Sequence, residues 1–220
     1  MFVALFLAKK TKNGWRLIFT GAAVWAGIQV SRVILYWLFI LVSPNWQPFA
    51  KINNIPILIL FSVFMGTQAG FLEGIGKYLI FRYNPQNTRT WLQAIAIGVG
   101  WGGMEVIVSG AYNLLSATLG NHGGSGAWFL LSCALLERVA TFILHIAFCV
   151  LILQDFAQNR KIFLWAVILW HSSIDIWETF FIYQGEFLTA GSYLVVSAIF
   201  GLFIISQYRP VKNSLKAATA

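Results

Sequence analysis

The residues of this chain that could perform chemistry lie within long apolar stretches. Five of its seven acidic residues do so, together with three basic residues and two histidines. They are Glu73, Glu105, Glu137, Asp175, Glu178, Arg32, Lys77, Arg138, His145 and His171. Carboxylates and imidazoles serve as general acids and bases and as metal ligands. Ionisable groups are rare at membrane depth, where they face a bundle interior and mark functional sites. The sequence therefore predicts a polar site inside an apolar protein.

The composition indicates that a lipid bilayer surrounds these residues. Hydrophobic residues make up 59% of the 220 residues and charged residues 10%, and the mean hydropathy is +0.74. A water-soluble globule of this composition would expose large apolar patches. A spanning helix needs about 20 predominantly apolar residues. Six ranges meet this need: 17–42, 55–83, 91–119, 128–153, 162–181 and 188–208.

We therefore expect an all-α, polytopic transmembrane helical bundle that forms a single integral membrane domain over residues 1–220. Six spans follow a short apolar N-terminal stub with the sequence MFVALFL, which is too short to cross a bilayer. The long continuous apolar runs exclude a barrel of alternating strands.

The basic residues predict the orientation of this bundle. On the six-span topology one side receives Lys9, Lys10, Lys12, Arg16, Arg82, Arg89, Arg160, Lys161, Arg209, Lys212 and Lys216, and the other side receives Lys51. Cytoplasmic loops of membrane proteins carry such an excess of lysine and arginine. Both termini are thus expected in the cytoplasm, and we expect the membrane to be the plasma membrane of a bacterium. The net charge of +8 then needs no nucleic-acid partner, and the lipid bilayer is the expected partner.

The depth of each ionisable residue follows from its distance along the helix, at about 1.5 Å per residue. Glu73, His145 and His171 share a layer roughly 12 to 15 Å from the cytoplasmic boundary. A second layer, roughly 19 to 24 Å deep, contains Arg32, Glu105, Glu137, Arg138 and Asp175. We interpret Arg32, Glu137 and Arg138 as structural support, since opposite charges can compensate one another. Glu178, nearer the outer surface, is expected at a solvated or hydrogen-bonded helix end.

Glycines recur at intervals of four in two neighbouring spans. They are Gly66, Gly70 and Gly74 in one span, and Gly98 and Gly102 in the next. Such spacing lets helix backbones approach closely. We therefore expect ranges 55–83 and 91–119 to pack tightly, which would bring Glu73 and Glu105 together. A GxGxxG pattern at 98–103 lacks a preceding strand and does not indicate dinucleotide binding.

Four ordered sequence blocks resemble one known family. The blocks are EGIGKY (73–78), GVGWGGME (98–105), ERVATFILH (137–145) and HSSID (171–175). Their order resembles that of the YhfC family of intramembrane metalloproteases, which is related to CAAX-processing prenyl endopeptidases, to PrsW proteases and to the polytopic scaffold subunit of gamma-secretase. The resemblance covers most of the chain. It implies a helical membrane fold with an extra amino-terminal helix, of which the stub is the remnant.

The resemblance implies a set of catalytic residues. Those matching the family pattern are Glu73, Glu105, His145, His171 and Asp175. Three positions depart from it. Gly74 stands where a second glutamate is expected, Lys77 replaces an arginine, and Trp101 stands where the glycine-rich block has a histidine.

Two chemistries remain open for these residues. Peptide hydrolysis needs an activated water, which a Zn²⁺ on Glu73, His145 and His171 would supply. Alternatively, Glu73 is the general base, His145 orients the water, and His171 with Asp175 supports the developing charge.

Three functions follow, from different classes. The first is an intramembrane endopeptidase that cuts a membrane-embedded or membrane-proximal peptide, which the retained histidine pair favours. The second is a catalytically silent relative that binds a partner or substrate helix, which Gly74 and Trp101 favour. The third is a subunit of a small-solute transporter, against which the lack of inverted repeats and proline-broken helices counts. Whether the chain is an enzyme stays open at this point.

Overall fold

The computed structural model describes residues 2–11, 13–42, 54–83, 89–119 and 125–208, and all the regular secondary structure among them is helical. The prediction of an all-α protein is confirmed. The helices are α1 (Phe2–Lys10), α2 (Gly14–Val42), α3 (Ile55–Tyr83), α4 (Trp91–Leu119), α5 (Ser125–Gln158), α6 (Ile162–Gln184) and α7 (Phe187–Gln207). Lys12, Lys51, Arg209, Lys212 and Lys216, which entered the orientation argument, lie outside the described residues.

Five of these helices contain segments long and apolar enough to cross a membrane. The segments are Gly14–Val42, Ile55–Tyr83, Trp91–Tyr112, Ser132–Gln158 and Leu188–Gln207. The chain is therefore an integral membrane protein whose apolar helices contact lipid. Helices suit this environment because they satisfy their backbone hydrogen bonds internally. The 23-residue α6 is not among the five, and it carries His171, Asp175 and Glu178 among its apolar residues.

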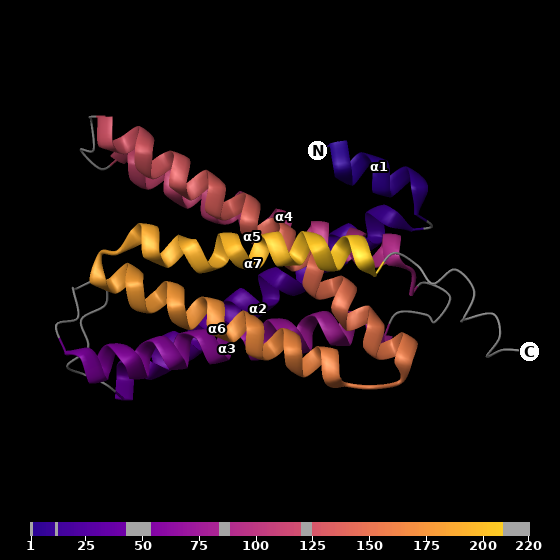
Figure 1. Ribbon diagram of the computed structural model, residues 1–220, viewed down its shortest axis with the longest axis horizontal. Coiled ribbons are helices and arrows are strands. Elements are labelled where there is room, and N and C mark those ends of the chain that lie inside the picture. Colours follow the sequence, from indigo (N-terminus) through magenta and orange to yellow (C-terminus); the bar gives the residue numbers. More distant parts are fainter. Residues whose placement is uncertain (1, 12, 43–53, 84–88, 120–124, 209–220) are drawn as a thin grey trace, which may run out of the picture.

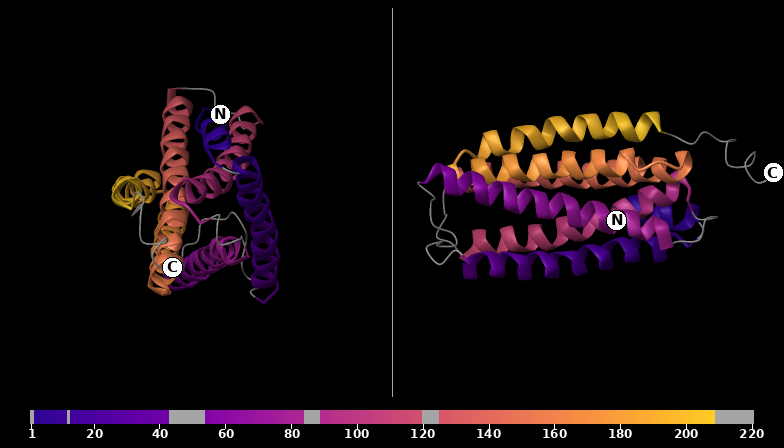
Figure 2. Two further views of the ribbon diagram at one scale, coloured as in Figure 1. Left: turned by 90° about the vertical axis from the view of Figure 1, so that its right-hand side faces the viewer. Right: turned by 90° about the horizontal axis from the view of Figure 1, so that it is seen from below.

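The helices that carry the ionisable residues pack around one another. α3 lies against α6, α4 lies against α5 and α2, and α5 also packs on α7 (Figure 1). α2 and α7 lie on opposite sides of the bundle (Figure 2). The predicted stub is the short helix α1, which contacts α2 and α4 and buries Leu7.

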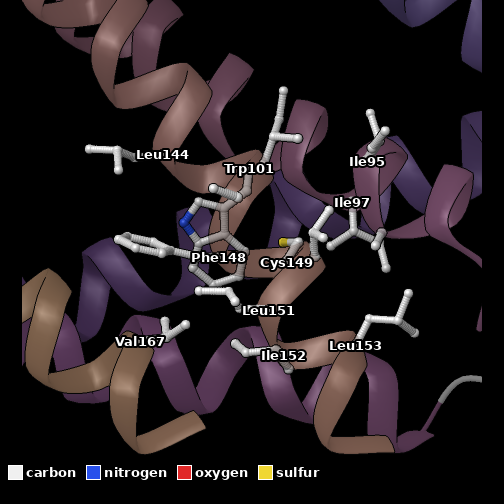
Figure 3. Packing of buried hydrophobic residues seen from close by; sticks show 14 of the residues in the cluster. Ile95, Ile97, Trp101, Leu144, Phe148, Cys149, Leu151, Ile152, Leu153 and Val167 are labelled. Atoms are coloured by element: carbon white, nitrogen blue, oxygen red, sulfur yellow. The ribbon is translucent and has the colours of Figure 1, made fainter. Parts of the chain in front are cut away.

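A dense apolar core lies between α4 and α5. Trp101 from α4 packs among Phe148, Cys149 and other buried residues of α5 (Figure 3). Ile97 and Ile152 are also fully buried in this cluster. This core holds α4 and α5 together beside the polar residues, so it limits how far Glu105 and His145 can separate.

The predicted pairing of the two glycine-rich spans is wrong. α3 and α4 do not form a substantial helix pair among the described residues. A Cβ at Gly70 would lie 2.6 Å from the backbone nitrogen of Ser172 on α6, whereas a Cβ at Gly98 would lie 2.6 Å from the Cα of Ile146 on α5. The glycines do permit close approach, but α3 approaches α6 and α4 approaches α5. The spacing of four identifies a close-packed face without identifying its partner.

Both ends of α6 are held by specific hydrogen bonds. The Asp155 carboxylate on α5 accepts the backbone N–H groups of Phe163 (3.0 Å) and Leu164 (2.6 Å), which have no partner within the helix. Gly185 ends the helix in the left-handed conformation, with φ of 81°. Its N–H bonds to the Ile182 carbonyl oxygen at 3.0 Å. The Asp155 contacts join the start of α6 to α5 and so help to set the axial position of its histidine and aspartate, while Gly185 ends the helix.

Candidate functional site

The predicted site residues line one cavity of about 50 Å³ inside the bundle. All five predicted catalytic residues contribute to its wall, namely Glu73, Glu105, His145, His171 and Asp175. Two of the predicted support residues, Arg32 and Arg138, also line it. The two layers inferred from depth therefore form a single connected site, because long side chains reach across the axial distance between helix turns.

Glu73 lies at the centre of this network with 1% of its side chain exposed. Its Oε1 accepts hydrogen bonds from Arg32 Nη1 (3.2 Å) and Gln29 Nε2 (3.3 Å) on α2. Its Oε2 accepts hydrogen bonds from Lys77 Nζ (3.2 Å) and Trp101 Nε1 (2.9 Å). Four donors from three helices thus fix the carboxylate of one residue.

His145 is held by Glu105. The His145 Nε2 atom lies 2.7 Å from Glu105 Oε2, and the same oxygen accepts a hydrogen bond from Trp25 Nε1 at 3.1 Å. A carboxylate only accepts hydrogen bonds, so we assign the His145 proton to Nε2. The Nδ1 atom then presents a lone pair toward Glu73 Oε2, 3.9 Å away.

His171 has a similar arrangement on α6. Its Nε2 faces Asp175 Oδ1 at 3.6 Å, while its Nδ1 lies 4.0 Å from Glu73 Oε2. Asp175 is in turn 3.7 Å from Arg32 Nη2. The nearby negative charge favours the Nε2-protonated tautomer of His171. Two imidazoles from α5 and α6, each with a carboxylate behind it, therefore face the same oxygen of Glu73.

Glu137 and Arg138, predicted as a compensated pair, do form an ion pair. Arg138 Nη1 also lies 3.9 Å from Glu105 Oε1. Arg138 therefore connects the pair to the carboxylate behind His145. The prediction that these two residues give structural support stays a prediction.

The ionisable groups of this network include more acidic than basic side chains. With every carboxylate ionised, five carboxylates meet three cationic side chains among the described residues. The carboxylates are Glu73, Glu105, Glu137, Asp175 and Glu178, and the cations are Arg32, Lys77 and Arg138. The surplus of two charges equals the charge of one divalent cation.

The buried donor atoms fit a metal ion. One ligand atom from each of Glu73, Glu105 and His145 lies within 4.8 Å of the other two. His145 Nδ1 and His171 Nδ1 are buried and have no hydrogen-bond partner among the described residues. Imidazole and carboxylate are ligands that suit zinc. The sequence suggested Glu73, His145 and His171 as metal ligands. The group of close donor atoms contains Glu105 in place of His171, although His171 Nδ1 lies 4.0 Å from Glu73 Oε2.

The three departures from the family pattern have structural consequences. A Cβ at Gly74 would lie 2.5 Å from Ile168 Cγ1, so a glutamate there would require the Ile168 side chain of α6 to move. Trp101 is fully buried and replaces the expected histidine with a hydrogen-bond donor to Glu73. Lys77 places a second donor on the same oxygen.

Sequence reasoning missed three residues of the site. Glu178, expected at a solvated or hydrogen-bonded helix end, lines the cavity, and it follows Asp175 by three residues on the same face of α6. Gln29 and Trp25 on α2 donate to Glu73 and Glu105. Gln29 could have been found as a polar residue one turn before Arg32, whereas tryptophan in a membrane helix carries no such signal.

The fold and the site define a class: a polytopic membrane protein with a carboxylate–histidine centre among its helices, able to accept a metal. The sequence matches the family of the YhfC intramembrane metalloprotease over residues 1–123 and 121–199, and the chain belongs to this family. The family suggests a metal cofactor, and zinc agrees with the ligand types. Neither the curated proteins nor the solved structures include a significant match.

Proposed function

We propose that this chain is an intramembrane endopeptidase that hydrolyses a membrane-embedded or membrane-proximal peptide bond with a metal-activated water. One observation carries the proposal. The Nδ1 atoms of His145 and His171, which have no hydrogen-bond partner among the described residues, both lie within about 4 Å of Glu73 Oε2. Buried polar atoms without a partner are rare in proteins. A cation bound here would satisfy both nitrogens and would share the Glu73 oxygen, which already accepts hydrogen bonds from Lys77 and Trp101.

Glu73, His145 and His171 would hold the metal. A divalent zinc ion, when bound, lowers the pKa of a water ligand and polarises the peptide carbonyl. Glu105 acts behind His145 by accepting a hydrogen bond from its Nε2–H group, which keeps the Nδ1 lone pair free. Asp175 Oδ1 faces Nε2 of His171 at 3.6 Å, and when ionised it would favour the proton on that nitrogen. Both are positioning residues in this assignment.

Other features hold the centre in place and leave room for water beside it. Arg32 connects Glu73 to Asp175, so one guanidinium fixes carboxylates from α3 and α6. The cavity of about 50 Å³ has room for a few water molecules. A hydrolytic water therefore has space beside the ligands.

Peptide cleavage by protein reconstituted in liposomes tests this proposal. The probe is a set of single-span apolar peptides, with products identified by mass spectrometry. We expect cleavage that a zinc chelator abolishes, and a loss of about 10- to 100-fold in Glu105→Gln, because outer-shell partners of metal ligands have effects of this size. Exposed Glu186 supplies the control, since Glu186→Gln removes the same charge far from the cavity. Chelator-resistant cleavage would refute the metal mechanism.

The proposal includes the topology of six spans with both termini in the cytoplasm. α6 would be the additional span that brings the number from five to six, and it comes fifth in chain order. The start of α2 and the end of α7 lie at the same end of the bundle, near the connection between α5 and α6 (Figure 1). That end contains Arg16, Arg82, Arg160 and Lys161, as the positive-inside rule requires of a cytoplasmic face.

Reporter fusions check this topology. A reporter fused after Ala220 should show cytoplasmic activity, and one inserted within residues 120–127 should show the opposite side. An external carboxyl terminus would contradict the six-span arrangement.

A catalytically silent relative is the second candidate function. Its specific support is that all four hydrogen bonds to Glu73 come from side chains of this chain, two of them cationic. If the reconstituted protein binds no zinc and cleaves none of the peptides, the silent relative becomes the better assignment.

A further inference from the structure

Lys77 is a buried cation to which the chemistry proposed above gives no role. It lies one turn after Glu73 on α3, and none of its side chain is exposed. Its Nζ is 3.2 Å from Glu73 Oε2 and 3.9 Å from the centroid of the Trp101 ring. Contact between an ammonium and an indole face is most favourable where water is excluded. The ring and the carboxylate therefore hold Lys77 from two sides.

The carboxylate of Glu73 has no acceptor position to spare. An ionised carboxylate offers about four lone-pair sites, and four side chains donate to this one. Arg32 and Gln29 occupy Oε1, so they lie on the oxygen that faces away from the histidines. Lys77 and Trp101 occupy Oε2, the oxygen that both imidazole Nδ1 atoms face.

Trp101 fixes the position of Lys77. Its indole N–H donates to the same oxygen of Glu73 that Lys77 contacts. The ring fills space above Gly76, where a Cβ would lie 2.9 Å from Trp101 Cη2. The ring also packs in the buried apolar cluster between α4 and α5 (Figure 3). The rigid indole ring of Trp101 thus holds the flexible Lys77 side chain in position beside Glu73.

We propose that the Lys77 ammonium, held against the Trp101 ring, competes with a divalent metal ion for the Glu73 carboxylate and thereby lowers the metal affinity of this chain. The inference rests on the proposed metal centre at Glu73, His145 and His171.

The competition has a direct physical cause. A zinc ion bound to Oε2 would lie about 2.0–2.2 Å from that oxygen. With Nζ 3.2 Å from the same oxygen, the ion and the ammonium would be separated by less than about 5.5 Å. Two positive charges at this distance repel each other, more strongly beside a buried side chain than in bulk water. A metal ion can therefore bind only if the Lys77 ammonium moves away or if the binding free energy exceeds the repulsion between the two charges.

The test is Zn²⁺ affinity, measured by calorimetry on detergent-solubilised, monodisperse protein. Lys77→Met keeps the apolar stem and removes the charge, and we expect it to bind Zn²⁺ at least about 10-fold more tightly than the parent. Lys77→Arg keeps a cation and should show no gain. Lys161→Met removes an exposed lysine at the start of α6 and should also leave the affinity unchanged.

A second variant covers the case in which Lys77→Met does not fold. Trp101→Phe keeps an aromatic ring but removes the N–H group from Glu73, and it should bind Zn²⁺ several-fold more tightly than the parent.

The outcomes separate this inference from the proposed function. Tight Zn²⁺ binding that is equal in the parent and in Lys77→Met would overturn the competition and leave the metal centre standing. Binding that appears only in Lys77→Met would support the competition and show that the parent does not use zinc. Absence of binding in the parent and in every variant would overturn both.

Discussion

We expect the replacement of both His145 and His171 with alanine to abolish Zn²⁺ binding, because it removes two of the three proposed ligands. The change removes both partnerless Nδ1 atoms and leaves Glu73 as the single remaining member of the proposed ligand set. Structural zinc sites have apparent binding free energies of about 10–16 kcal/mol from four ligands. We therefore expect the loss of two imidazoles to weaken binding by about 1,000-fold or more.

Metal analysis of purified protein, followed by calorimetric titration, measures this effect. The chain contains three histidines, so His122→Ala, in the polar sequence GNHGGSG outside the described residues, is a matched control. That control should keep the parent's zinc content. If the double variant retains near-stoichiometric zinc, the ion lies elsewhere, and the assignment of these histidines is wrong.

Replacing Arg32 with alanine should lower the free energy of unfolding far more than replacing an exposed arginine of the same helix. Its guanidinium contacts Glu73 on α3 (3.2 Å) and Asp175 on α6 (3.7 Å), and it extends from α2. The variant would leave Asp175 without its cation and Glu73 with one cation fewer. Breaking a buried pair typically costs about 3–5 kcal/mol. Since 21% of the Arg32 side chain is exposed, we expect roughly 3 kcal/mol, at the lower end of this range.

Unfolding of the variant in detergent, by heat or denaturant, provides the measurement. Arg16→Ala is the matched control because Arg16 is an exposed arginine on the same helix. A change in an exposed side chain of this kind is usually within about 0.5 kcal/mol. Equal stability of the two variants would show that Arg32 does not link the three helices.

The candidate site was predictable from residue type and position to a large extent. Ionisable side chains within apolar runs must point into the bundle because lipid cannot solvate them. This argument found Glu73, Glu105, His145, His171 and Asp175, which all line the cavity. It placed Glu178 at a solvated or hydrogen-bonded helix end because of its position near the outer surface, whereas the structure places it in the wall of the same cavity.

The roles of the departures could not be read from the sequence. Gly74 and Trp101 were visible as missing ligands, but a sequence does not show what occupies the vacated space. The structure shows Ile168 against Gly74, and Trp101 above Gly76. It also shows the Lys77 ammonium on the Trp101 ring. These contacts depend on distances between side chains of different helices.

The sequence by itself determined the helices and their environment. Runs of about 20 apolar residues must form helices that satisfy their own backbone hydrogen bonds in a bilayer. That property is local, so α2 to α7 begin and end close to the predicted bounds.

Only the tertiary structure decided which helices meet. The glycines at 66, 70 and 74 predicted a close-packed face on α3, yet the partner of that face is α6 and not the next helix in the chain. Periodicity defines the direction of a face within one helix. The choice of partner depends on how two surfaces, distant in the sequence, fit each other in shape. That fit places His171 and Asp175 of α6 beside Glu73 of α3, and it therefore creates the site.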